Sequence, residues 1–149
     1  MHLLRLYFDT SVLAIYTYFS ETEKSKCEVV SELLNRCIED KIEITVSFYS
    51  LHELFLLAFK YLSKEQSKIG LESVRTIVNM PIKLVPLLPR EKRLIYHKRF
   101  KITDRTDIPH AITAFVYECD YIVTYDTHFK EISEHISVGT PKEIIEKLG

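Results

Sequence analysis

Short apolar runs rich in β-branched and aromatic residues alternate along the chain with longer segments of helical spacing. The short runs cover 3–8, 42–47, 82–85, 121–124 and, more weakly, 136–138. They predict strands, whereas apolar residues that recur every three or four positions, as at Val29, Leu33 and Cys37, predict helices. Strands joined through helices need crossover connections, so the pattern predicts an α/β fold with a parallel central sheet.

The composition is that of one ordinary globular domain. The 149 residues are 46% hydrophobic, which is enough to bury a real core, and neither a composition shift nor an internal repeat divides them. Only three glycines occur, so the sequence has neither a flexible linker nor a glycine-rich phosphate loop. We therefore expect a single domain over residues 1–149.

Charge and cysteine content narrow the function classes. The chain has 20 Lys and Arg against 21 Asp and Glu, so nucleic-acid binding would need a local basic patch. The three cysteines form no C-x-x-C pair, which argues against zinc or redox chemistry and favours a reducing cytosol. The longest apolar run, 54–59, is too short to cross a bilayer, and the first residues lack signal-peptide features. We expect a cytoplasmic protein that does not enter membranes.

Acidic residues follow or flank the predicted strands. Asp9 stands directly after the first strand, and Asp126 follows the fourth. Asp104 and Asp107 lie at the start of an apolar helical segment, and Glu53 lies one to two turns into another. Ligands of open parallel sheets bind beyond the carboxyl ends of the strands, so we expect these acids to gather at one edge of the sheet.

Two interpretations of the acids compete. Taken singly, Asp9, Asp107 or Asp126 could cap a helix, and Glu53 could lie in a salt bridge or in solvent. Taken together, several carboxylates in one place repel one another unless a positive charge lies between them. Mg²⁺ and Mn²⁺ prefer oxygen ligands and would neutralise such a group, so the acids together predict a metal site.

Four stretches of the sequence, YFDTSVLAIY, SLHE, TDIPHAITA and CDYIVTYDTHF, carry a resemblance. In order and spacing they resemble the motifs of the PIN domain, the nuclease fold of VapC-type toxins, over nearly the whole chain. The resemblance implies a three-layer α/β/α sandwich with a short, mainly parallel sheet of about four to five strands. It also implies metal-dependent hydrolysis of RNA with Mg²⁺ or Mn²⁺, a cognate antitoxin protein as partner, and a two-fold homodimer.

The resemblance assigns the catalytic and metal-binding roles to four acids, Asp9, Glu53, Asp107 and Asp126. We expect Asp9 and Asp107 to be the direct ligands, with Glu53 and Asp126 holding waters or a second ion. Asp104 is one acid more than the usual motif and is a candidate addition to the site.

Three polar neighbours of these acids are further candidates. The hydroxyls of Ser11 and Thr124 could orient a water or a carboxylate, although capping for Ser11 and sheet packing for Thr124 explain them equally well. His110 lies one helical turn after Asp107. A single His without a second one lacks a zinc pattern, so we expect His110 to be buried and hydrogen-bonded rather than a ligand.

The segment 89–105 is rich in Lys and Arg and leads directly into the third acidic motif. Such a run is commonly a solvated helix face. Alternatively, it forms an RNA-binding rim that offsets the repulsion between an acidic site and phosphates, with Tyr96 and Phe100 available for stacking. The cations of this predicted rim are Arg93, Lys98, Arg99 and Lys101.

The long helical segments after Ser20 and Ser63 carry more apolar residues than one small sheet can cover, which favours a homodimer. The apolar residues behind this expectation are Val29, Leu33, Leu56, Phe59, Tyr61, Ile69 and Leu71.

Rival functions differ in class. A phosphotransferase of the haloacid dehalogenase type would need a second Asp two residues after Asp9, where Ser11 stands. A receiver domain would need adjacent acids early in the chain. A PIN-like scaffold that binds RNA or protein without catalysis is the remaining alternative.

Overall fold

A sheet of five parallel strands forms the centre of the computed structural model, which describes residues 2–61, 68–101 and 105–149. The strands are β1 (Arg5–Phe8), β2 (Glu43–Ser47), β3 (Lys83–Val85), β4 (Tyr121–Val123) and β5 (Ser137–Gly139). They correspond to the five apolar runs of the sequence, which confirms the predicted strands and the α/β fold class. Their order across the sheet is β3-β2-β1-β4-β5.

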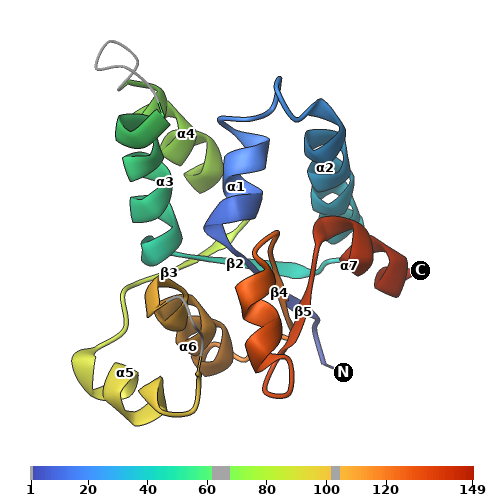
Figure 1. Cartoon of the computed structure of the whole chain (residues 1–149). Helices are drawn as coiled ribbons and strands as arrows, with labels where there is room; N and C mark the ends of the chain where they lie inside the picture. Colours follow the sequence, from blue (N-terminus) through green and yellow to red (C-terminus); the bar gives the residue numbers. More distant parts are fainter. Residues whose placement is uncertain (1, 62–67, 102–104) are drawn as a thin grey trace.

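Helices cover both faces of the sheet and give three layers (Figure 1). One face is covered by α1 (Thr10–Tyr16), α2 (Lys24–Glu39), α3 (Phe48–Tyr61), α4 (Lys68–Val78) and α7 (Pro141–Leu148). The other face is covered by α5 (Arg90–His97), α6 (Ile108–Val116) and the 3₁₀ segments η2 (Arg105–Asp107) and η3 (Thr127–Ile132). The predicted three-layer sandwich is therefore confirmed.

The strands divide their side chains between the two layers. On β1, Leu6 and Phe8 pack into the core beneath α1 and α2, whereas Tyr7 belongs to the core beneath α6. Successive strand residues point to opposite faces of the sheet, and here helices cover both faces and exclude solvent from them. This explains why the strands read as continuous apolar runs rather than as alternating ones.

The order in which successive strands are added to the sheet changes side at β1. From β1 it moves to β2 and β3 on one side, and it then crosses to β4 and β5 on the other. The connections from β1 and β4 therefore leave the sheet in opposite directions and open a crevice at their carboxyl ends. The residues that follow these two strands, Asp9 and Thr124, meet in this crevice.

The close approach of α3 and α4 depends on Gly70. A Cβ atom at this position would lie 3.0 Å from the carbonyl oxygen of Phe55 and 3.0 Å from Cβ of Ala58. Such distances are tighter than most Cβ contacts, so a larger residue would require α3 and α4 to shift by a few tenths of an ångström.

Two side chains that the sequence led us to expect at the surface are buried. Phe100 is fully buried and packs against Phe115 and His135, so the prediction that it is available for stacking was wrong. Leu33 is also fully buried and does not contribute to an exposed apolar surface. The side chain of Tyr61 and the whole of Asp104 lie outside the described residues. Within the described ranges, no helix is both long and apolar enough to cross a membrane.

Candidate active site

Asp9 lies at the junction of β1 and α1, where it has two structural partners. It is the N-cap of α1, and it is 5% exposed. Its Oδ2 accepts hydrogen bonds from the hydroxyl of Ser11 at 2.9 Å and from the hydroxyl of Thr124 at 2.8 Å. The two hydroxyl side chains therefore orient the carboxylate, and capping and participation in the site are compatible roles for Asp9.

The same two hydroxyls fix the turn that follows β4. The Ser11 hydroxyl accepts from the backbone N–H of Tyr125 at 3.0 Å, and the Thr124 hydroxyl accepts from the backbone N–H of Asp126 at 2.9 Å. Asp126 then caps η3 by accepting from the backbone N–H of His128 at 2.9 Å. These bonds place the fourth predicted acid beside the first.

Asp107, Asp126 and His128 form the tightest acidic cluster of the site. Nδ1 of His128 lies 3.2 Å from Oδ1 of Asp126 and 4.0 Å from Oδ2 of Asp107. One ligand atom from each of the three lies within 4.8 Å of the others, and within the described residues this is the one group of three with that spacing. Sequence reasoning missed His128, although its place two residues after a capping Asp turns its ring towards that carboxylate.

Glu53 is held from two sides. Its Oε1 lies 2.7 Å from Nε2 of His110, and its Oε2 accepts from the hydroxyl of Thr10 at 2.7 Å. His110 is fully buried, and its Nδ1 lies 2.6 Å from the Tyr7 hydroxyl. The expectation that His110 is a buried, hydrogen-bonded residue is confirmed, whereas the role of Thr10 had no signal in the sequence.

The electrostatics of His110 reflect its position among the acids. Burial lowers the pKa of His110, but the hydrogen bond to Glu53 and the negative charges of Asp9, Glu53 and Asp107 outweigh burial, and its pKa is raised above the ordinary value. Burial also raises the pKa of the Tyr7 hydroxyl, which stays protonated.

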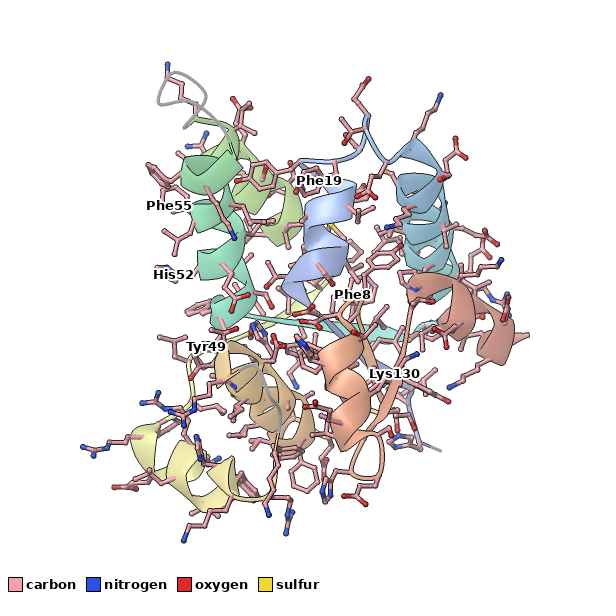
Figure 2. The ribbon with its side chains drawn as sticks, viewed as in Figure 1. Phe8, Phe19, Tyr49, His52, Phe55 and Lys130 are labelled. Carbon is pink, nitrogen blue, oxygen red and sulfur yellow. The ribbon has the colours of Figure 1, made fainter. Side chains whose placement is uncertain are left out.

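All four predicted acids line one cavity of about 420 Å³. The cavity runs along α1 from Asp9 to Phe19, and Figure 2 shows Phe8 and Phe19 at the two ends of that helix. Its walls come from α1, the start of α2, α3, the η2–α6 junction and the turn after β4. Residues distant in the sequence thus meet where the topology predicts a ligand site.

The cavity is acidic but contains one cation among its described lining residues. Lys26 lies 3.1 Å from Glu23 and has its ammonium group 5.0 Å from the centre of the Tyr125 ring. It lies on α2 and lines the same cavity as the four predicted acids. The net field in the cavity is negative, which favours a bound cation.

The four predicted rim cations are exposed and lie around α5 and α6. Lys98 and Lys101 line a hollow together with Arg105 and Ile108, the residue that follows Asp107. Arg93 lines an adjoining hollow with Arg105 and Ile108.

Arg99 is placed differently from the other three. Its guanidinium stacks 5.1 Å from the Phe115 ring centre and 5.7 Å from that of Tyr96, near the end of α6 opposite to Asp107.

Comparison with known proteins identifies the class of fold. No family model matches the sequence, and no curated protein matches it. Solved structures do match. VapBC2 from Rickettsia felis, bound to a DNA fragment from its promoter, is 17% identical with a TM-score of 0.64, over 92% of this chain and 98% of that one.

Two further structures match over similar lengths. VapBC-1 from nontypeable Haemophilus influenzae is 18% identical with a TM-score of 0.60, over 93% of this chain and 99% of that one. VapC20 of Mycobacterium tuberculosis, a sarcin-ricin loop cleaving toxin, is 11% identical with a TM-score of 0.60, over 89% of this chain and 98% of that one. The fold is that of a VapC-like PIN domain.

Proposed function

We propose that the chain is a metal-dependent endoribonuclease that hydrolyses phosphodiester bonds in RNA, and that it acts as the toxin of a toxin–antitoxin pair. The observation that carries the proposal is the convergence of Asp9, Glu53, Asp107 and Asp126 on one cavity. Each comes from a different segment of the chain, and a purely structural role would not require them to meet. The VapC-like fold supports the same reaction class.

The donor set fits Mg²⁺ or Mn²⁺. Asp107 and Asp126 offer carboxylate oxygens, which hard divalent cations prefer, and His128 adds an imidazole nitrogen within the same 4.8 Å group. A bound ion would supply Lewis acidity that activates water and offsets the charge on the phosphate. Asp107 and Asp126 are therefore our proposed direct ligands, a different pairing from Asp9 with Asp107.

Asp9 and Glu53 have a second role in this proposal. Oδ2 of Asp9 and both oxygens of Glu53 already accept hydrogen bonds from the protein, so these side chains are held in place before any ligand arrives. Each oxygen retains a lone pair that can accept a hydrogen bond from water. Asp9 and Glu53 thus complete the negative cavity and orient water in it.

RNA is the substrate that best suits the surroundings of the cavity. An acidic site repels phosphates unless cations lie nearby. Lys98 and Lys101 border a hollow that adjoins Ile108, next to Asp107, and Arg93 and Arg105 border the neighbouring one. A single strand that crosses this surface would reach the acids from the α6 side, while Lys26 approaches from the α2 side.

Two protein partners belong to the proposal. The comparison structures from Rickettsia felis, Haemophilus influenzae and Salmonella typhimurium are VapBC structures, and by analogy we propose a cognate antitoxin for this chain. We also propose a homodimer through α3 and α4. Leu56, Phe59 and Leu71 there are 45%, 59% and 48% exposed, which is unusual for large apolar side chains on neighbouring helices.

Calorimetry separates the nuclease from a non-catalytic scaffold. Wild-type protein titrated with Mn²⁺ should show a saturable binding heat, and Asp107→Asn should abolish it. Glu146→Gln, which removes an exposed charge on α7, is the matched control and should bind like wild type. Absence of binding in the wild type would favour the scaffold over the enzyme.

A further inference from the structure

Both carboxylate oxygens of Glu53 are engaged by donors from other elements. Thr10, the first residue of α1, donates its hydroxyl hydrogen to Oε2 at 2.7 Å, and His110 on α6 contacts Oε1 at 2.7 Å. The Glu53 side chain is nevertheless 40% exposed and lines the acidic cavity. A solvent-reaching carboxylate that is clamped at both oxygens has lost most of the rotamer freedom of a surface glutamate.

His110 is anchored from behind by a chain of buried hydroxyls. Its Nδ1 lies 2.6 Å from the hydroxyl of Tyr7, and that hydroxyl lies 2.7 Å from Oγ of Ser47 and 3.3 Å from Oγ of Ser50. All four of these residues are fully buried. This series of hydrogen bonds therefore extends from the end of β2 through β1 and α6 to Glu53, the one member that reaches solvent.

Glu53 determines which atoms donate and which accept in this series of hydrogen bonds. An ionised carboxylate only accepts, so Nε2 of His110 must carry the hydrogen that it shares with Oε1. In the neutral imidazole, Nδ1 then accepts from the Tyr7 hydroxyl, and in the imidazolium Nδ1 donates to it. Either way every member of the chain has a partner, because the hydroxyls of Tyr7, Ser47 and Ser50 can each donate or accept.

We propose that His110 is a positioning residue, which together with Thr10 fixes the Glu53 carboxylate in the orientation it needs inside the cavity. The role in RNA hydrolysis rests on the proposed function, whereas the clamp itself is a property of the fold. A histidine that served only to fill the core would leave the nearby carboxylate to solvent. Here the imidazole is fully buried, yet its Nε2 contacts the Glu53 carboxylate.

Nuclear magnetic resonance tests the clamp without metal or substrate. In wild-type protein labelled at histidine, the Nε2 hydrogen of His110 should give a downfield resonance that exchanges slowly with water. Glu53→Gln keeps the shape of the side chain but removes its charge, so this resonance should move upfield. A His110 resonance that is the same in wild type and in Glu53→Gln would overturn the proposal.

Kinetics test what the clamp does. His110→Leu should lower kcat for RNA cleavage about 10- to 100-fold and leave the KM for RNA nearly unchanged, since other residues bind the strand. His110→Gln, which can present a donor nitrogen to Glu53, should recover part of the loss. Thr113→Val is the matched control, because Thr113 is equally buried on α6 and its hydroxyl donates to the Pro109 carbonyl.

The outcomes separate the clamp from the proposed function. Folded His110→Leu with wild-type kcat would remove the positioning role. If His110→Leu does not fold, Thr10→Val breaks the other half of the clamp and must lower kcat in the same way, or the inference fails. Wild-type protein that cleaves no RNA would refute the proposed function, and the resonance of His110 would still decide whether Glu53 is clamped.

Discussion

The hydroxyl of Thr124 donates a hydrogen bond to Oδ2 of Asp9 across 2.8 Å and thereby joins the end of β4 to the end of β1. The two residues are 115 positions apart in the chain. Ser11 adds a second hydroxyl to the same oxygen at 2.9 Å. The site is thus assembled by the pairing of the two central strands, and Asp9 is oriented by the fold before any ligand binds.

Removing the Thr124 hydroxyl should affect stability and activity together. Thr124→Val leaves the buried Oδ2 of Asp9 with one donor fewer, so the free energy of unfolding should fall by about 1 to 2 kcal/mol. Cleavage of RNA should also fall, because Asp9 is less well oriented. Urea unfolding and RNA cleavage measure the two effects. Unchanged values for both would show that the hydrogen bond from Thr124 to Asp9 contributes neither to stability nor to activity.

The apolar surface on α3 and α4 predicts an oligomer. The rings of Phe59 and Phe55 meet edge to face with their centres 5.5 Å apart, and Figure 2 shows Phe55 on the side of α3 that faces away from α1. Wild-type protein should sediment as a dimer at micromolar concentration, and Phe59→Lys should sediment as a monomer because it buries a charge in the interface. Leu94→Lys, a control on the exposed face of α5, should remain a dimer. A wild-type protein that is entirely monomeric would contradict this prediction.

The basic surface predicts a salt-dependent contribution to RNA binding. Replacing Lys98 and Lys101 with Ala should weaken binding and reduce the slope of log affinity against log salt by about 0.7 for each lost phosphate contact. Mn²⁺ affinity should stay the same, because neither residue lines the acidic cavity. The charge-matched control replaces Lys142 and Lys147 on α7. If both double variants have the wild-type slope, the surface around α5 is only a solvated face.

The capping box of α7 predicts a pH-dependent increment of stability. Hydrogen bonds from the backbone N–H and the side chain of Thr140 lower the pKa of Glu143 below 4.5 in the folded protein. A lowered folded-state pKa means that the ionised form is favoured in the native state, so its stabilisation is complete above about pH 4.5 and is lost as the pH falls through the folded-state pKa.

Comparison of Glu143→Gln with wild type checks this increment. The variant should be less stable at pH 7 by at most about 0.5 kcal/mol, since the pair is exposed. The difference should shrink as the pH is lowered through the folded-state pKa, because wild-type Glu143 then becomes protonated and resembles the neutral amide. Thermal unfolding at neutral and at acidic pH measures this stability difference. A difference that grows on acidification would contradict the predicted direction of the pH dependence.

The sequence predicted the features that depend on local pattern and on sheet topology. Strands buried on both faces appear as apolar runs, and acids that follow such runs must come together because parallel strands end at the same edge. Asp9 and Asp126 could be placed in this way. The burial of Phe100 could not be predicted, because its sequence neighbours are charged and suggest an exposed position. Only the structure shows that it packs against Phe115 and His135.

The contacts of Glu53 show where sequence reasoning ends. Its partners Thr10 and His110 lie 43 and 57 positions away, on helices whose relative placement no local pattern determines. The residues themselves were visible in the sequence, and His110 was expected to be buried. That its ring should meet Glu53, and that His128 rather than Asp9 should join the Asp107 and Asp126 cluster, follows only from the packing of the layers.

RNA cleavage in the presence and absence of Mn²⁺ is the most direct test of the central claim. Wild-type protein and Glu146→Gln should cleave RNA with Mn²⁺ and stop when EDTA removes the ion. Asp107→Asn should be inactive at a melting temperature equal to or above that of wild type, because the substitution relieves repulsion among the acids. Cleavage by Asp107→Asn at the wild-type rate, or cleavage by wild type that EDTA does not affect, would contradict the account.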